Sequence, residues 1–133
     1  MAMKPDFDVI ACSWLAQFST FLTSLDARGV ATCFHDHRYL RDILVFTWTN
    51  RTLKGHAKIT EYLEGSLCLA AITAVKLDSR MHLTPSFMPM AGSVVSGFTS
   101  ETAVGPCQGY FFLNPMPSGE WKALSVFITL VDI

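Results

Sequence analysis

FHDHRYLRDILVFTWTN, residues 34–50, is the stretch around which the rest of the chain is best interpreted. It combines two histidines with two aspartates and two arginines, although charged residues make up only 16% of the sequence. β-Branched and aromatic residues dominate from Tyr39 to Thr49, which predicts an extended strand. Such a polar cluster in a chain that is otherwise half apolar indicates one wall of a pocket.

Apolar residues on either side of this stretch recur at helical spacing. They predict a first helix that starts at Asp8 and ends near Ser24–Asp26, and a short second helix from Ala27 to Phe34. Arg51–Gly55 has the composition of a turn, and it leads into a third helix from His56 to about Ala71.

The second half of the sequence is dominated by strand patterns. The expected strands are Ile72–Met81, Ser93–Val104, Gln108–Leu113 and Trp121–Asp132. Between the first two, residues 82–92 contain two prolines and cannot form a regular central strand. Two interpretations of this segment stay open, a bulged strand beneath a dimer contact and a pocket lid. The order of elements predicts one α+β domain over residues 1–133, with helices on one face of a curved antiparallel sheet.

Composition excludes several classes of partner. The net charge is −1 and there is no basic patch, so we expect neither nucleic acid nor an anionic membrane as a partner. The four cysteines are far apart and form no CxxC pair, which is typical of reduced thiols. No signal peptide and no run of about 18 apolar residues is present, so we expect a cytoplasmic protein.

Several motifs together resemble the NTF2-like superfamily. They are FHDHRYLRD at 34–42, the GHAKI segment at 55–59, TWTNRTLKGH at 47–56 and the strand-rich C-terminal third. The chain is most similar to the SnoaL-like branch, and also to the NTF2-like domain that precedes some flavin-dependent monooxygenases. The resemblance implies a cone: a bent antiparallel sheet wrapped by three helices around a mostly apolar pocket. Members include isomerases, cyclases and dehydratases, and also non-enzymatic binding modules, so the fold alone does not fix the function.

The resemblance places a general base at Asp42, on the first strand. A carboxylate in an apolar cone loses hydration, which raises its pKa and makes it a better proton acceptor at neutral pH. Strand alternation puts Arg38, Leu40 and Asp42 on one face, so Arg38 is a candidate to steady an oxyanion. The alternative is a structural ion pair between Asp42 and a neighbouring arginine.

The chain also departs from the ketosteroid isomerase pattern. Phe18 stands where those enzymes carry an oxyanion-hole tyrosine, and no acid is present near Gln108–Tyr110. This argues against a steroid-type isomerase with that oxyanion hole. Tyr110 is a candidate hydrogen-bond donor if it faces inward, and otherwise an ordinary core residue.

The two histidines of the polar stretch have two interpretations. His35 and His37 lie two residues apart on a strand, a spacing that suits a zinc or iron site if a third ligand is supplied from elsewhere. Alternatively, His37 assists acid–base chemistry at the mouth of the cone. Trp14, Phe18, Trp48 and Met88 are candidate walls for a polycyclic ligand, or plain core.

The sequence thus supports two hypotheses. The first is a cofactor-independent, SnoaL-like isomerase or cyclase, or less favourably a dehydratase, that rearranges a hydrophobic polycyclic natural product and forms a homodimer. The second is a non-catalytic ligand-binding or dimerisation module associated with an oxidase. No glycine-rich nucleotide loop is present, so we do not expect this chain to bind the flavin itself.

Overall fold

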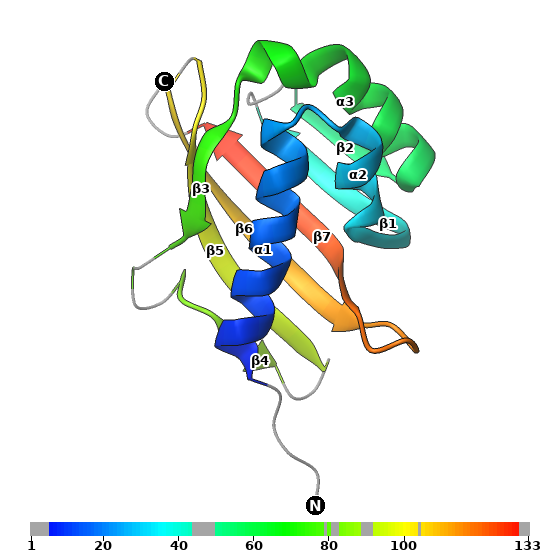
Figure 1. Cartoon of the computed structure of the whole chain (residues 1–133), viewed down its shortest axis with the longest axis vertical. Helices are drawn as coiled ribbons and strands as arrows, with labels where there is room; N and C mark the ends of the chain where they lie inside the picture. Colours follow the sequence, from blue (N-terminus) through cyan, green and yellow to red (C-terminus); the bar gives the residue numbers. More distant parts are fainter. Residues whose placement is uncertain are drawn as a thin grey trace, which may run out of the picture.

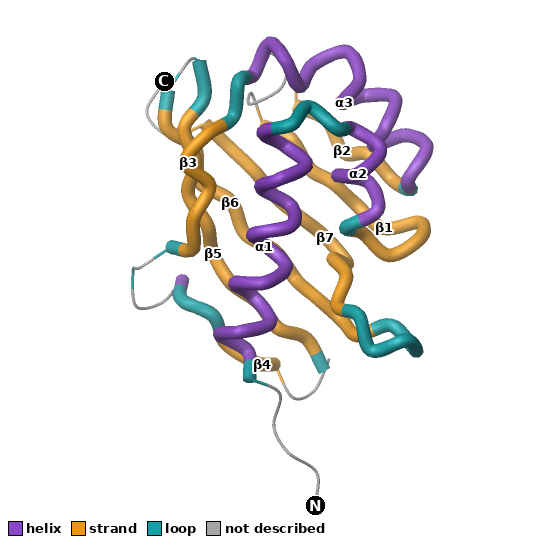
Figure 2. The backbone as a smooth tube through the Cα atoms, viewed as in Figure 1, coloured by secondary structure: helices purple, strands orange, loops and turns teal. Residues whose placement is uncertain are grey.

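The structure is a computed structural model that describes residues 6–43, 50–78, 80, 83–88, 92–103 and 105–130. The helices are α1 (Phe7–Thr23), α2 (Ala27–Thr32) and α3 (His56–Ala70). The strands are β1 (Phe34–Ile43), β2 (Asn50–Lys54), β3 (Thr73–Leu77), β4 (Ser86–Met88), β5 (Ser93–Glu101), β6 (Pro106–Pro115) and β7 (Trp121–Leu130). The helices lie on one face of a curved sheet (Figure 1 and Figure 2), so the fold is α+β as expected.

The described strands form one sheet in the order β2-β1-β7-β6-β5-β3, with β4 also paired to β5. The sheet is mixed rather than antiparallel, because β1 and β7 run parallel. This corrects the expectation of a purely antiparallel sheet. β1 and β7 are distant in sequence and both start at the same end of the sheet, where the Ala123 amide donates to the Cys33 carbonyl at 2.8 Å. Two strands that enter from the same end can only pair in parallel.

Irregular pairing accompanies the curvature of the sheet. The register shifts between Phe34 and Tyr39 on β1, between Phe112 and Leu113 on β6, and between Thr73 and Lys76 on β3. Extra residues of this kind bend a strand and increase its local twist. The bent sheet curves around α1, which crosses its inner face (Figure 1).

α1 is positioned by an apolar stripe at helical spacing. Its buried residues are Ala11, Trp14, Leu15, Phe18 and Leu22. The helix begins after Asp6, whose carboxylate accepts a hydrogen bond from the Val9 amide at 3.2 Å. Such a cap satisfies one of the free amides of the first turn. The expected first helix is therefore found; it starts one residue before the expected Asp8 and ends at Thr23, just before the expected Ser24–Asp26.

The space between α1 and the middle of the sheet is filled by aromatic rings. Trp14 stacks on Phe18 with ring centroids 4.7 Å apart, and it also meets Phe111 at 4.7 Å. Phe98 lies 6.2 Å from Phe18 and 6.0 Å from Phe111. Gly109 leaves the room for Phe98, because a Cβ at position 109 would lie 2.2 Å from the Phe98 ring. We call the rings of Trp14, Phe18, Phe98 and Phe111 the aromatic cluster.

Several boundaries differ from the sequence-based expectation: α2 ends at Thr32 rather than at Phe34, and the differences at β1, β2 and β4 are the largest. β1 starts at Phe34 rather than at Tyr39, and its expected end at Thr49 lies outside the described residues. The expected turn at 51–55 is mostly strand β2, which pairs with β1. Within residues 82–92, Ser86–Met88 form the short strand β4 along β5. A three-residue edge strand tolerates the neighbouring prolines, because it needs few ladder hydrogen bonds.

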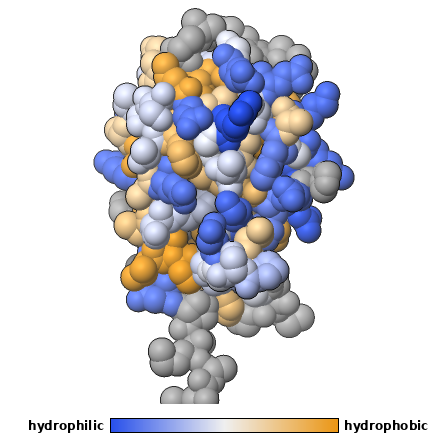
Figure 3. Space-filling view, turned by 45° about the vertical axis from the view of Figure 1, so that its right-hand side comes forward, coloured by the Kyte–Doolittle hydropathy of each residue, from blue (hydrophilic) through white to orange (hydrophobic). Residues whose placement is uncertain are grey.

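One face of the molecule is mostly polar. Hydrophilic side chains cover most of the centre and right of the face in Figure 3, and apolar ones gather on its left-hand side. Among the described residues, the large hydrophobic side chains that remain exposed are Val9, Leu25, Tyr39, Met88 and Phe127.

Candidate functional site

The far end of β1 carries Asp42, the expected general base. The register aligns Leu40 with Val126 and Asp42 with Ile128. Leu40, Val126 and Ile128 are each 1% exposed and belong to the core beneath the helices. The backbone register thus leaves the prediction that position 42 faces the same side as Leu40 in place. The Asp42 side chain itself lies outside the described part of the structure.

Arg38 does not share the buried environment of Leu40. Its side chain is exposed, as is that of Tyr39, whereas Leu40 is buried. The pairing of β1 with β7 is irregular before Tyr39, because five steps along β1, from Phe34 to Tyr39, match only two along β7. Such a bulge disturbs the alternation of side chains. Arg38 is therefore exposed where Leu40 is buried, and the expectation that both face the same side stays a prediction.

Tyr110 lies on the outer face of the sheet. It is aligned with Phe127 of β7, which is 37% exposed between the buried residues Val126 and Ile128. On β6 its neighbour Phe111 is fully buried on the opposite face. The Tyr110 ring packs instead against Phe112 at 5.3 Å. Tyr110 is thus directed away from the interior, where an oxyanion-stabilising hydroxyl would be needed.

The other expected site residues are dispersed. Trp14 and Phe18 are 4% and 2% exposed and belong to the aromatic cluster. Met88 lies on β4 and is 42% exposed. Trp48 and the side chain of His37 lie outside the described residues. The structure therefore brings Trp14 and Phe18 together, but not with Arg38, Tyr110 or Met88.

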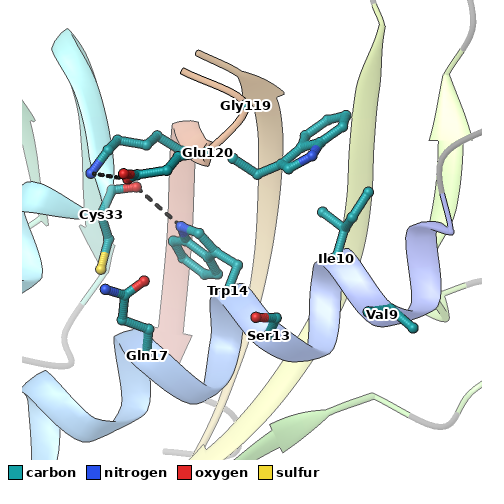
Figure 4. Close-up of a pocket in the computed structure, with 10 residues that line it drawn as sticks. Val9, Ile10, Ser13, Trp14, Gln17, Cys33, Gly119 and Glu120 are labelled. Carbon is teal, nitrogen blue, oxygen red and sulfur yellow. Dashed lines mark hydrogen bonds and ion pairs between the residues drawn. The ribbon is translucent and has the colours of Figure 1, made fainter. Parts of the chain in front are cut away.

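A hollow opens between α1 and the turn that joins β6 to β7. It has a volume of about 430 Å³, within the range of about 300–1,000 Å³ that is typical of ligand pockets. We call it the α1–hairpin groove. Figure 4 shows Ile10, Ser13 and Gln17 rising from α1 toward Cys33 and the turn at Gly119–Glu120. Trp14 forms part of its floor, and Trp121 and Lys122 complete the opposite wall.

Hydrogen bonds fix the walls of this groove. Trp14 Nε1 donates to the Cys33 carbonyl oxygen at 3.1 Å, which ties α1 to the end of α2 (Figure 4). Lys122 Nζ donates to the carbonyl oxygen of Thr32 and lies 3.7 Å from Glu120 Oε2. The Lys122 side chain is only 22% exposed, whereas that of Glu120 is 70% exposed. The mostly buried Lys122 ammonium is therefore paired with a Glu120 carboxylate that is mostly exposed to solvent.

Cys33 lines the groove but is not a nucleophile at neutral pH. Burial raises the pKa of its thiol to about 12, and the nearby Lys122 ammonium only partly opposes this effect. Because the thiolate is the reactive form, a thiol with such a pKa stays inert. We therefore do not expect Cys33 to form a covalent bond with a ligand in the groove.

A histidine–carboxylate pair stands at the start of α3. His56 Nε2 lies 2.7 Å from the Phe34 carbonyl oxygen, and Nδ1 lies 3.5 Å from Asp36 Oδ1. Asp36 is 82% exposed, so the pair is a surface contact that ties α3 to β1. His35 Nε2 is likewise engaged, 3.0 Å from the Asn114 carbonyl oxygen. Within the described part of the chain, no three histidine, cysteine, aspartate or glutamate side chains gather as a metal site would require.

The sequence interpretation did not identify the groove residues Gln17, Trp121 and Lys122. Ser13 and Gln17 accompany Ile10 at helical spacing on α1, and this mixed polar and apolar stripe was a usable signal. The sequence carries no comparable signal for Trp121 and Lys122, because the groove forms only when the β6–β7 turn folds beside α1.

Comparisons with known proteins bear on the fold. No family model matches the sequence, and no curated protein matches it. Among solved structures, a ketosteroid isomerase-like protein from Erwinia carotovora atroseptica SCRI1043 superimposes with a TM-score of 0.76 at 12% identity, covering 98% of this chain and 100% of its own.

Two Streptomyces proteins are also similar in structure. Aln2 from a Streptomyces species has a TM-score of 0.71 at 18% identity, over 97% of this chain and 94% of its own. A candidate dehydratase of the NTF2-like family from Streptomyces avermitilis has a TM-score of 0.68 at 14% identity, over 98% of this chain and 100% of its own. The chain therefore has the NTF2-like fold, with a curved mixed sheet and three helices. Among the described helices, none has the length and apolar character needed to cross a bilayer.

Proposed function

We propose that this NTF2-like chain is a cofactor-independent isomerase or cyclase that moves a proton on a hydrophobic polycyclic intermediate of secondary metabolism. Asp42 is the general base in this proposal. The observation that carries it is the register of β1, which aligns Asp42 with the core residue Ile128, two positions after the buried Leu40. The descriptions of two structural neighbours, ketosteroid isomerase-like and candidate dehydratase, favour acid–base chemistry.

The proposed reaction needs only one carboxylate. Asp42 takes a proton from a carbon next to a ketone, so that a C–H bond breaks, an O–H bond forms and an enolate remains. The same proton is then returned at another carbon, and no electrons are gained or lost. A carboxylate beside apolar neighbours suits this task, because desolvation raises its pKa toward the working pH.

The aromatic cluster limits where the substrate binds. Trp14, Phe18, Phe98 and Phe111 fill the space beneath α1, so the substrate would rest against their outer edge at the Asp42 end of β1. Arg38 is exposed on the same strand, and we assign it to the rim, where it would contact an anionic substituent.

The proposal is tested by deuterium exchange into 2-tetralone, a fused-ring ketone with acidic C–H bonds, followed by NMR in D₂O. We expect the wild-type protein to accelerate the exchange and Asp42→Asn to lose about 100-fold or more of that acceleration. Asp36→Asn is the matched control, because it removes an exposed carboxylate from the same strand. Full exchange activity in a folded Asp42→Asn protein would overturn the assignment.

A second candidate function is a non-catalytic ligand-binding or dimerisation module associated with an oxidase. The filled interior favours it, because the aromatic cluster leaves less room for substrate than an open cone. Exposed aromatic residues on the outer sheet face, Tyr39 and Phe127, favour a homodimer in either case. Wild-type protein that does not accelerate the exchange of 2-tetralone would favour this module.

A further inference from the structure

The α1–hairpin groove lies at the opposite end of β1 from Asp42. Cys33, which lines the groove, directly precedes β1, and Phe34 is aligned with Ala123 at the start of β7. Asp42 is aligned with Ile128, near the other end of both strands. The two β7 partners, Ala123 and Ile128, are five steps apart, which is about 17 Å at roughly 3.3 Å per residue. The groove is therefore separate from the proposed catalytic position.

The apolar surface of the groove suits a flat ring. Ile10 lies on one wall and the half-buried Trp121 on the other, and the Trp14 indole lies beneath them. Trp14 is held in place by its bond to the Cys33 carbonyl and by stacking on Phe18. An aromatic ligand that enters such a preformed site gains contact area without disturbing the core.

The polar groups of the groove select an anion. An ammonium group has three N–H donors, and Lys122 directs one to the Thr32 carbonyl oxygen. Its other described partner, Glu120, is beyond hydrogen-bond distance at 3.7 Å and is largely exposed. Glu120 can turn into solvent at little cost, since exposed ion pairs contribute little stability. The Gln17 amide and the Ser13 hydroxyl on α1 also line the groove and supply further donors.

The geometry points to a second ligand site in this groove, one that binds an aromatic carboxylate. The ring lies against Trp121 and Ile10, and the carboxylate takes the place of Glu120 beside Lys122. The site is distinct from the proposed catalytic position, because Asp42 lies toward the other end of β1, although Trp14 belongs both to the groove floor and to the aromatic cluster. Binding is reversible, because Cys33, the thiol among the described residues that line the groove, stays protonated.

The test is a calorimetric titration of the full chain with 2-naphthoate, with tryptophan fluorescence as a second readout. We expect Lys122→Met to weaken binding about tenfold, because it keeps the aliphatic stem but removes the charge-assisted hydrogen bond. We expect Glu120→Gln to tighten binding several-fold, because the ligand no longer competes with a carboxylate. Lys58→Met, which removes an exposed lysine on α3, is the control and should leave the affinity unchanged.

An uncharged probe separates charge recognition from ring binding. 2-Naphthamide should bind wild-type protein more weakly than 2-naphthoate does. Its own affinity should be the same for wild type and for Lys122→Met. Equal affinity of 2-naphthoate for wild-type and folded Lys122→Met, or no binding at all, would overturn the proposal. Lys122→Met should also retain the acceleration of 2-tetralone exchange, so the failure of either proposal can be recognised without affecting the other.

Discussion

Cys33 couples the stability of the fold to alkaline pH. Its sulfur is buried and donates weakly to the Gly29 carbonyl oxygen at 3.7 Å. Burial raises the pKa of the thiol from 9.0 to about 12. The folded-state pKa is thus higher than the unfolded-state pKa. The stabilising contribution is therefore complete below pH 9 and is lost as the pH rises from 9 toward 12.

This coupling can be measured by urea unfolding at about pH 7 and about pH 10. We expect the wild type to lose about 1 kcal/mol more of its unfolding free energy over this range than Cys33→Ala does. Cys12→Ala removes an exposed thiol and should behave like the wild type. An identical pH dependence in wild type and Cys33→Ala would contradict this, because it would mean that Cys33 has the same pKa in the folded and unfolded states.

The residue scale also shows the limits of prediction at the proposed catalytic site. Position 42 was predicted on the inner rank of a strand, and the register aligns it with the core residue Ile128. For Arg38 the structure shows an exposed side chain beside a bulge that precedes Tyr39, and nothing in the local sequence marks that bulge. For Tyr110 the sequence left both faces open, and only pairing with Phe127 places it outside.

Helices and strands differ in how well they were predicted. The ends of α3 match the prediction to about one residue and those of α1 to within about three, because an amphipathic period of 3.6 residues is a local signal. The composition of residues 51–55 predicts a turn where the structure has β2. A five-residue polar strand is recognisable only through its pairing with β1. The early start of β1 was missed because His35, Asp36 and His37 have low strand propensity, and tertiary pairing overrides it.

The same substitution should have opposite effects in two elements. In β6, a Cβ on Gly109 would lie 2.2 Å from the Phe98 ring and 2.8 Å from the Phe127 carbonyl oxygen. In α3, a Cβ on Gly65 would meet nothing within 4 Å. Gly109 is therefore required by packing, whereas Gly65 only costs helix stability.

We expect Gly109→Ala to lower the unfolding free energy by about 1–3 kcal/mol, because the ring and the neighbouring strand must shift. Gly65→Ala should raise it by about 0.5–1 kcal/mol, as alanine is the better helix former. Chemical denaturation monitored by circular dichroism measures both. If Gly109→Ala were as stable as the wild type, the close packing of β6 against Phe98 would be contradicted.

At the scale of the whole molecule, the parallel pairing of β1 and β7 was beyond prediction. The strands are separated by about 80 residues, and strand patterns carry no information on relative direction. The same pairing creates the α1–hairpin groove, because it sets Cys33 beside Ala123 and brings the β6–β7 turn to α1. Sites assembled from three distant segments in this way follow from topology and not from any local motif.

The outer sheet face carries aromatic side chains that the helices do not cover. Tyr39 and Phe127 are 38% and 37% exposed on the neighbouring strands β1 and β7. Tyr110 and Phe112 are half-buried beside them on β6, with rings 5.3 Å apart. A contiguous exposed aromatic surface is typical of a protein–protein contact. A homodimer, in which this face packs against its copy, would bury it by a two-fold symmetric contact.

We predict that the wild type forms this dimer and that Phe127→Lys stays monomeric, because the substitution places two like charges near the two-fold axis and removes an aromatic contact. Sedimentation velocity or light scattering over a range of concentrations measures the change in mass. Val9→Lys, at a 61% exposed position on α1, adds the same charge elsewhere and should leave the dimer intact. A wild-type protein that stays monomeric at every concentration would contradict the dimer. A dimer that survives in Phe127→Lys would place the contact on another surface, because a lysine buried at the centre of such an interface costs several kcal/mol.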